Sequence, residues 1–307
     1  FAAGGGEVWV REGVYRGTTD PLVQLKDEVA VYGGFAGVES EREQRDWAGR
    51  PTVLDGENRR RCVIGADTAV LDGFIVTRGR ECMMTRSSVV ANCVFTKNTS
   101  GGMGNSGGSP RIINCLFKDN ATTGGGGGFA SYGGMPELIN CVFTGNTAGY
   151  GGGVSGAITI TNCLFFGNSA TVKAGGVAFS DGASLLTNCI VWGNTAPVNP
   201  EIGLTEGAGT VTHSCVCGGY EGAGNLDADP LFVGAPDGSL RLLAGSPCVD
   251  AGTPQGAPTE DMLGVPRPQG AGVDMGPYEG TVAEEDIVTV TVETEPEGEG
   301  LITPAPG

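Results

Sequence analysis

The sequence has few charged residues, few aromatic residues and no long apolar run. Charged residues make up 17% and aromatic residues 7% of the 307 residues. No apolar stretch reaches the length of about 18 residues that a membrane-spanning helix needs. Glycine is abundant instead, with 56 residues, and each costs about 1 kcal/mol inside a helix. A helical bundle is therefore excluded, and the lack of a Gly-x-y period excludes collagen.

Basic residues are scarce in the second part of the chain. Residues 1–118 contain 15 Lys and Arg against 14 Asp and Glu, whereas residues 119–307 contain 3 against 21. The net charge of −17 disfavours nucleic acid and anionic membrane surfaces as partners. Such a charge favours solubility. An alternative interpretation is an electrically polarised particle that stacks end to end.

A short motif of Asn, Cys, an aliphatic residue and Phe or Val recurs along the middle of the chain. The five regular copies begin at Asn92, Asn114, Asn140, Asn162 and Asn188, and a degenerate copy at Ser214 to Cys217 continues the series. A second Asn follows each motif Cys at a fixed spacing, and glycine-rich stretches come next. An earlier variant copy spans Leu71 to Val76. Such self-similarity at a nearly constant period is typical of a repeat architecture.

The repeat predicts an all-β solenoid. Its β-branched and aromatic segments of about 3–6 residues are too short for helices and suit short strands. One repeat cannot bury its own apolar side, whereas stacked repeats share a continuous core. A β-propeller would need a longer period of about 40 residues, and the leucine-rich spacing is absent. We therefore predict a parallel β-helix over residues 1–224, with irregular first coils in 1–70 and regular repeats in 71–224.

The motif also predicts which side chains face inward. Asn tolerates the left-handed backbone that a sharp bend requires, so the five motif Asn residues should form an amide ladder at a corner. The next residue then points inward, which gives a thiol ladder of Cys93, Cys115, Cys141, Cys163 and Cys189. The same alternation gives an aromatic ladder of Phe95, Phe117, Phe143 and Phe165, continued by Val191.

The same alternation places the aliphatic residues of the motif on the outside. An exposed row of apolar side chains indicates a contact surface, and we interpret it as an assembly surface. If the alternation is reversed, these residues are core instead. The row contains Val94, Leu116, Val142, Leu164 and Ile190, with Val216 in the degenerate copy.

The ten cysteines suit packing and disulfide formation better than metal binding. Cys215-x-Cys217 lacks the spacing of a zinc knuckle, and His213 is the only histidine. We expect no metal and no other cofactor. Ladder thiols on stacked coils have parallel Cβ directions, which disfavours disulfides between them. A disulfide from Cys248 to Cys217 or Cys215 would hold the closing segment on the last coil.

Residues 225–280 carry a different pattern. They contain Ser246-Pro247, then Asp250-Ala251-Gly252, later Asp261, Gly264 and Arg267, and finally Asp274, Gly276 and Tyr278-Glu279. With the repeats, this sequence resembles secreted bacterial right-handed parallel β-helix proteins of the pectate-lyase-like superfamily. The closing segment resembles the module called choice-of-anchor Q. The resemblance implies an extracellular or bacterial cell-surface protein with an irregular cap. It also implies that Asp250, Asp261, Arg267 and Asp274 form a structural hydrogen-bond and ion-pair cluster; a catalytic role is the alternative.

Residues 281–307 form a third segment. Ile287, Val288, Val290 and Val292 belong to one alternating strand, which is followed by an acidic, proline-rich tail. A single strand is not stable alone. We expect it either to begin a following module or to pair with another copy of the chain by β-augmentation.

The pattern of ionisable residues argues against catalysis. A glycosidase needs two carboxylates about 5–9.5 Å apart, and the acids between 119 and 206 do not recur in register. That region offers Lys173 as its only basic residue. We expect a non-catalytic structural or adhesive protein that binds copies of itself, inserts into no membrane and assembles into a filament or layer. The alternatives are a glycan-binding module that uses Trp192, Phe166, Tyr150 and Tyr132, and a degenerate polysaccharide lyase or hydrolase.

Overall fold

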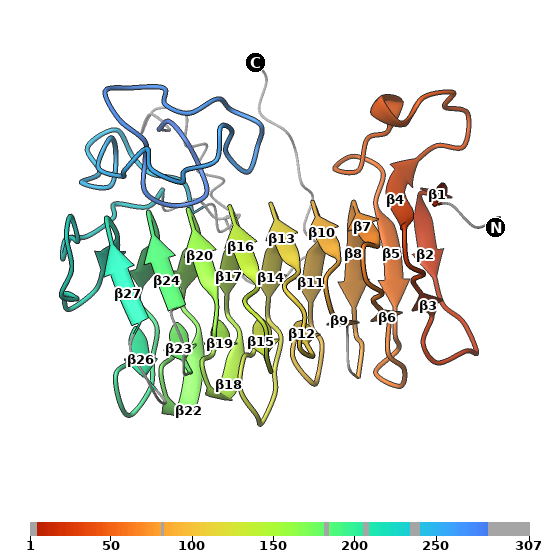
Figure 1. The fold of residues 1–307 in the computed structure, drawn as a ribbon, viewed down its shortest axis with the longest axis horizontal. Coiled ribbons are helices and arrows are strands. Elements are labelled where there is room, and N and C mark those ends of the chain that lie inside the picture. Colours follow the sequence, from red (N-terminus) through yellow and green to blue (C-terminus); the bar gives the residue numbers. More distant parts are fainter. Residues whose placement is uncertain (1–4, 81–82, 181–183, 205–208, 234–239, 282–307) are drawn as a thin grey trace, which may run out of the picture.

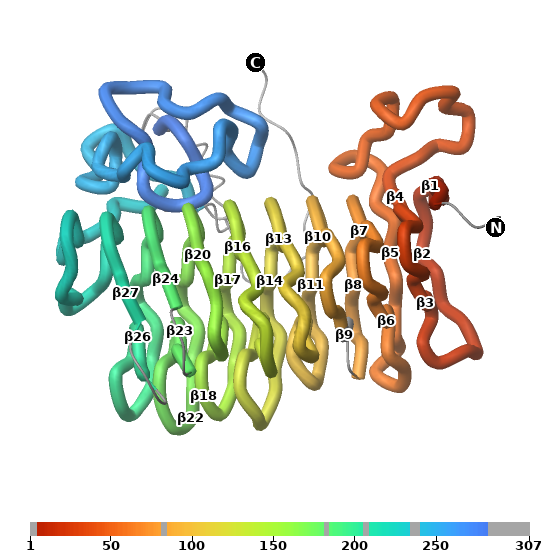
Figure 2. Tube along the Cα trace, viewed as in Figure 1, coloured from red at the N-terminus to blue at the C-terminus, as the bar shows by residue number. Residues whose placement is uncertain are grey.

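The computed structural model describes residues 5–80, 83–180, 184–204, 209–233 and 240–281. Within them the chain is a solenoid whose coils stack along one axis (Figures 1 and 2). Every pairing between the named strands is parallel, and three sheets run the length of the solenoid. The prediction of an all-β parallel solenoid is confirmed.

Each coil contributes one short strand to each sheet. Sheet A contains β1 (Gly6–Arg11), β4 (Val29–Phe35), β7 (Val70–Asp72), β10 (Val89–Ala91), β13 (Arg111–Ile113), β16 (Glu137–Ile139), β20 (Thr159–Thr161), β24 (Ser184–Thr187) and β27 (Gly209–Thr212). Sheet B contains β2 (Gly13–Tyr15), β5 (Thr52–Asp55), β8 (Phe74–Thr77), β11 (Val94–Thr96), β14 (Leu116–Lys118), β17 (Val142–Thr144), β21 (Leu164–Phe166), β25 (Ile190–Trp192) and β28 (Cys215–Val216). Sheet C contains β3 (Val23–Gln24), β6 (Val63–Ile64), β9 (Met83–Thr85), β12 (Met103–Asn105), β15 (Phe129–Ser131), β19 (Val154–Gly156), β23 (Val177–Phe179) and β26 (Ile202–Leu204). Strands β18 (Thr147–Tyr150) and β22 (Ser169–Lys173) form a small additional pair.

The motif Asn residues lie at the corner between sheets A and B. Their φ angles of 50–55° are left-handed, a conformation that Asn adopts more readily than most residues. Gly73 takes this position in an earlier coil, with a φ of 80°, and His213 takes it in the last coil, with a φ of 46°. The sequence therefore marks most of these corners by a residue, Asn or Gly, that readily adopts a left-handed backbone conformation.

Two of the predicted ladders fill the core. The five motif cysteines are buried, and they follow the corner directly. The rings of Phe95, Phe117, Phe143 and Phe165 are stacked with centroid separations of 4.6–4.9 Å. Val191 pairs in register with Phe165 and continues this row. Parallel, in-register coils thus place like side chains on top of one another.

The degenerate last repeat is shifted by one residue from the predicted alignment. Cys215 pairs with Ile190 and Val216 pairs with Val191. Ser214 therefore occupies the position of the thiol ladder, and its hydroxyl accepts a hydrogen bond of 3.0 Å from the amide of Cys189. Val216 belongs to the interior, so its prediction as an outward residue is wrong.

A second amide row lies inside the solenoid, formed by the second Asn of each repeat. From Asn98 to Asn194, each Nδ2 donates to the Oδ1 of the next Asn at 2.8–2.9 Å. Each Nδ2 from Asn120 onward also donates to a backbone carbonyl of the preceding coil. The recurrence of this second Asn is visible in the sequence, but only the structure shows that its side chain is buried.

Two segments leave the solenoid. Residues 36–51, which include the 3₁₀ helix η1 (Arg42–Gln44), connect β4 and β5. The cap, defined as residues 225–280, is irregular, and its described residues form three isolated antiparallel bridges. Both segments lie on the same side of the solenoid, with the cap over the coils of β16 to β27 (Figure 1). No helix in the described part of the chain is long and apolar enough to cross a membrane.

Candidate functional site

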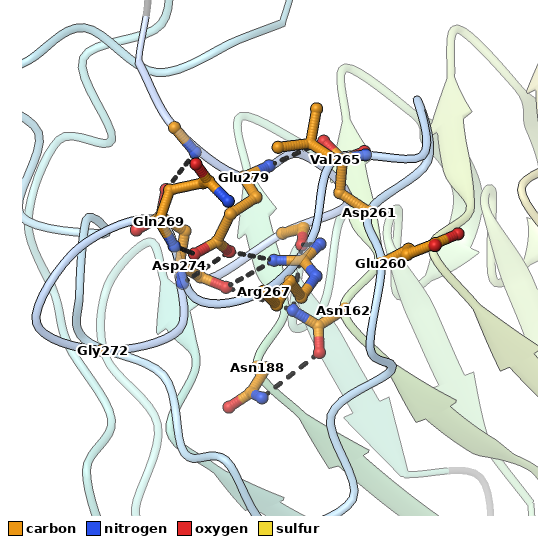
Figure 3. Close-up of polar contacts among 12 residues, drawn as sticks. Asn162, Asn188, Glu260, Asp261, Val265, Arg267, Gln269, Gly272, Asp274 and Glu279 are labelled. Atoms are coloured by element: carbon orange, nitrogen blue, oxygen red, sulfur yellow. Dashed lines mark hydrogen bonds and ion pairs between the residues drawn. The ribbon is translucent and has the colours of Figure 1, made fainter.

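The cap is attached to the corner amide ladder. Asn162 donates to the carbonyls of Asp274 and Gly276, both at 3.1 Å. Asn188 donates to the carbonyl of Thr253 and accepts from its amide, both at 2.8 Å. The corner Asn residues therefore turn the solenoid and also bind the backbone of the cap (Figure 3).

Arg267 lies at the centre of this junction. Its guanidinium pairs with Glu279 at 2.6 Å, and the two side chains are 1% and 0% exposed. It also donates to the carbonyl of Gly276 at 3.0 Å and to the Oδ1 of Asn140 at 3.4 Å. Burial lowers the pKa of Arg267 from its ordinary value. One buried cation thus connects three separate segments.

The three predicted aspartates organise backbone around this ion pair. Asp261 accepts from the amides of Leu263 and Val265 through one oxygen and from Glu279 through the other, at 2.7–2.9 Å. Asp274 accepts from the amides of Asp250 and Gly280 at 2.7 and 2.8 Å. Burial raises the pKa of Asp274.

Asp250 completes the same network, and its carboxylate accepts from the amide of Gly272 at 2.8 Å. The four residues predicted as a cluster therefore lie together. Their ion-pair partner, Glu279, was missed by the sequence analysis although it stands in the closing Tyr-Glu motif. All of these contacts are within the protein, and they stabilise the cap.

The outward apolar row is covered by this cap. Val142, Leu164 and Ile190 do point away from the solenoid core, yet their exposed fractions are 3%, 0% and 1%. They form a second apolar cluster with Leu242 and Met275 of the cap. The prediction of an exposed assembly surface is wrong for these residues, because the chain supplies its own cover. Leu116 and Val94 lie further along the row and are half-buried.

Cys215, Cys217 and Cys248 are all free thiols in this structure, so neither predicted disulfide from Cys248 is formed. Cys248 lies in the second apolar cluster with Cys215, whereas Cys217 lines the cavity beside Glu201. The neighbouring thiol lowers the pKa of Cys215 and raises that of Cys248. The one-residue shift of the last repeat explains the error. It turns Cys215 outward toward the cap and moves Cys217 to the position after the inward Val216.

The internal amide row ends at a buried carboxylate. Asn194 donates from its Nδ2 to Glu201 at 2.6 Å and from its backbone amide at 3.1 Å. Burial raises the pKa of Glu201 to about 7. Glu201 lines a cavity of about 390 Å³ together with Cys217 and Tyr220. The carboxylate of Glu201 thus accepts the hydrogen bonds from Asn194 that the next Asn accepts elsewhere in the row.

The aromatic residues considered for glycan binding do not form one surface. Phe166 and Trp192 pack against the second apolar cluster, and Phe166 makes an edge-to-face contact with Phe232 of the cap at 5.4 Å. Tyr132 and Tyr150 are 67% and 43% exposed. A cleft of about 330 Å³ instead separates the cap from the outer face of sheet A, lined by Arg111, Asn114, Glu260 and their neighbours.

Among the described residues, no strand pairs with the outer edge of the first coil. Strands β1, β2 and β3 are each the last strand of their sheet. Between them lies a cavity of about 210 Å³, lined mainly by apolar side chains such as Leu22, Leu54, Leu71 and Phe74. At the opposite end, residues 223–226 hydrogen-bond to the final coil through its backbone. The two ends are therefore built differently.

Several other ionisable residues form ion pairs. Asp55 is buried between Arg16 and Arg78, and although burial raises the pKa of Asp55, these arginines help to lower it to about 2. In the described ranges, no three His, Cys, Asp or Glu side chains are arranged to hold a metal. Glu137 pairs with Arg111 at 3.0 Å on the surface, and Lys173 donates to the carbonyl of Leu204. Asp181, Glu206 and the strand residues Ile287, Val288, Val290 and Val292 lie outside the described residues.

Comparisons with known proteins agree with this architecture. Residues 72–216 match the family model described as the right-handed β-helix region. The crystal structure of pectate lyase Pel9A is similar, with a TM-score of 0.51 over 91% of this chain and 89% of that chain. Its sequence identity is 12%, so the likeness concerns the fold alone. No curated protein matches the sequence. The chain is thus a right-handed parallel β-helix.

Proposed function

We propose that this chain is a non-catalytic structural or adhesive protein of the bacterial cell surface or extracellular space, and that its copies assemble end to end. The observation that carries the proposal is the outer edge of the first coil, where three sheets of the described chain end around an apolar cavity. Unpaired strand edges are templates for another strand. The partner is a second copy of this chain.

We propose that residues 287–292, whose sequence predicts a strand, add to this edge. Their Ile and Val residues alternate with Thr, as a strand with one apolar face requires. In the first coil, β1 shows the matching alternation of half-buried and exposed residues. Addition of such a strand to a free edge is β-augmentation, in which backbone hydrogen bonds supply affinity and alternate side chains supply specificity.

The role of the cap carboxylates supports a non-catalytic function. Asp250, Asp261 and Asp274 each accept hydrogen bonds from backbone amides of the cap, and Glu279 is paired with Arg267. These groups are used to hold the cap on the solenoid. A structural role therefore accounts for their placement without any substrate.

Assembly is tested by the mass of the particle in solution. We expect the full chain to form oligomers, and a chain that ends at residue 281 to remain folded but monomeric. Leu22→Lys should also prevent assembly, because a charge at the apolar cavity blocks an incoming strand. The matched control is Val198→Lys, since Val198 is 50% exposed and lies near the other end. A monomeric full chain, or oligomers that survive both changes, would refute the proposal.

A glycan-binding module is the second candidate, and the cleft beside the cap favours it. Ligand sites combine concave shape with a few polar groups, and this cleft offers the side chains of Arg111, Asn114 and Glu260. A polysaccharide array distinguishes the candidates. Binding that is lost in Arg111→Met, a surface change that should leave the fold intact, would favour the glycan-binding function, whereas no binding would remove it.

A further inference from the structure

We infer that Cys215 and Cys248, which are free thiols in this structure, form a disulfide under oxidising conditions that locks the cap over the outer apolar face of the solenoid. Cys215 lies in β28 of the last coil and Cys248 lies in the cap. Both side chains are fully buried in the same apolar cluster. The neighbouring thiol lowers the pKa of Cys215 and raises that of Cys248.

This pair differs from the thiols of the ladder. The ladder cysteines occupy equivalent positions of stacked parallel strands, so their Cβ directions are parallel, which is unsuitable for a disulfide. Cys215 and Cys248 come from two different segments that face each other. The neighbouring Ser246 hydroxyl accepts from the amide of Cys248 at 3.1 Å, and the carbonyl of Ala228 accepts from the Cys215 thiol at 3.1 Å. The bond to Ser246 does not involve the thiol and persists when the disulfide forms, whereas the Cys215 thiol gives up its bond to Ala228 on oxidation.

The chemistry is a thiol–disulfide exchange with a small-molecule disulfide, such as oxidised glutathione. The hydrogen bond from Cys248 lowers the pKa of Cys215, so Cys215 is the thiol that ionises first. Its thiolate attacks one sulfur of the oxidant and releases one thiolate. Cys248 then loses its proton and attacks the Cys215 sulfur, which releases the second thiolate. Two protein thiols are oxidised and one small disulfide is reduced to two thiols.

The location of the pair gives the bond a consequence. Val142, Leu164 and Ile190 are covered only because the cap is in place. A disulfide would connect the cap covalently to the coil that follows Ile190, and it would restrict the unfolded chain by closing the loop between Cys215 and Cys248. Loss of the bond would allow the cap to open more often and expose this apolar face. Since both thiols are buried, oxidation takes place as the cap folds.

Peptide mapping tests the inference. The full chain is refolded with oxidised and reduced glutathione, free thiols are alkylated under denaturing conditions, and the digest is analysed by mass spectrometry. We expect a crosslink between Cys215 and Cys248, with Cys217 alkylated. Fragmentation at Val216 separates the two neighbouring cysteines. A crosslink from Cys248 to Cys217, or full alkylation of Cys248, would overturn the inference.

Matched variants extend the test without depending on one substitution. Cys217→Ser should keep the crosslink, and Cys215→Ser should abolish it. The oxidised wild-type protein should denature roughly 5–15 °C above the reduced protein and should lose its cap to a protease more slowly. Equal midpoints and equal cleavage rates in the two redox states would contradict the proposed lock, even if the crosslink formed.

Discussion

Arg267 and Glu279 form a buried ion pair of 2.6 Å at the junction between the cap and the corner of the solenoid. Neither residue belongs to a repeat, and the pair is isolated from solvent. Arg267 also reaches Asn140 of the corner ladder, so the pair connects local structure in the cap with the regular part of the fold. This contact leads to the first prediction.

Arg267→Met should destabilise the protein by about 3–5 kcal/mol, because it leaves the buried carboxylate of Glu279 without a counter-charge. Urea unfolding measures this change. Arg111→Met is the matched control, because Arg111 pairs with Glu137 on the surface and should cost about 0–1 kcal/mol. Similar losses in the two variants would mean that the buried pair has no special role.

Leu164→Lys should weaken the attachment of the cap. The Leu164 side chain is fully buried against cap residues, and removing such a contact typically costs about 2–5 kcal/mol. We expect faster proteolysis within residues 225–280 and a lower unfolding midpoint. Leu185→Lys is the control, since Leu185 is 37% exposed on sheet A. Unchanged proteolysis of Leu164→Lys would contradict the position of the cap.

Glu201 should make stability depend on pH. Its folded pKa of about 7 lies above the ordinary value of 4.5 because of burial. The folded state therefore keeps a proton that the unfolded state loses, and this stabilisation is complete below pH 4.5 and is lost as pH rises through 7. The contribution amounts to roughly 3 kcal/mol.

Glu201→Gln keeps an acceptor for Asn194 and removes the titration. We expect the fall in unfolding free energy between pH 4.5 and 7 to become shallower in this variant. Glu221→Gln changes an exposed carboxylate and should leave the pH profile as it is. If Glu201→Gln retains the wild-type slope, Glu201 does not titrate as described.

The proposed lack of catalysis can be tested with acidic polysaccharides as substrates. Lyases release unsaturated sugars that absorb ultraviolet light, so a continuous absorbance assay detects them directly. We expect no increase in absorbance with or without added calcium. A calcium-dependent increase that scales with protein concentration would show a lyase and would refute the non-catalytic function.

The regular part of the fold was predictable because the sequence of each repeat indicates both where the chain turns and which side chains face inward. The motif Asn marks the left-handed corner, and the next residues alternate in and out, which places Phe117 and Cys115 inside. The last repeat lacked these markers. His213 stands at the Asn position and Ser214 at the Cys position of the motif. The sequence pattern instead aligned Cys215 with the motif Cys, whereas it pairs with Ile190 at the next position.

The covering of Leu164 could not be predicted from the repeat. Alternation shows that Leu164 points outward, but it says nothing about which segment lies on top. The cap returns to this face from a distant part of the chain, beyond the last coil, and its path is irregular. The cluster of Asp261, Asp274 and Arg267 was expected because the closing motif resembles that of a known family, and the spacing alone did not give it.

The most direct test of the proposed function is electron microscopy of the full chain combined with its light-scattering mass over a range of concentrations. End-to-end assembly predicts particles that lengthen along the solenoid axis and a mass that rises above 31.1 kDa as concentration increases. Isolated rods with the mass of one chain at every concentration would contradict it.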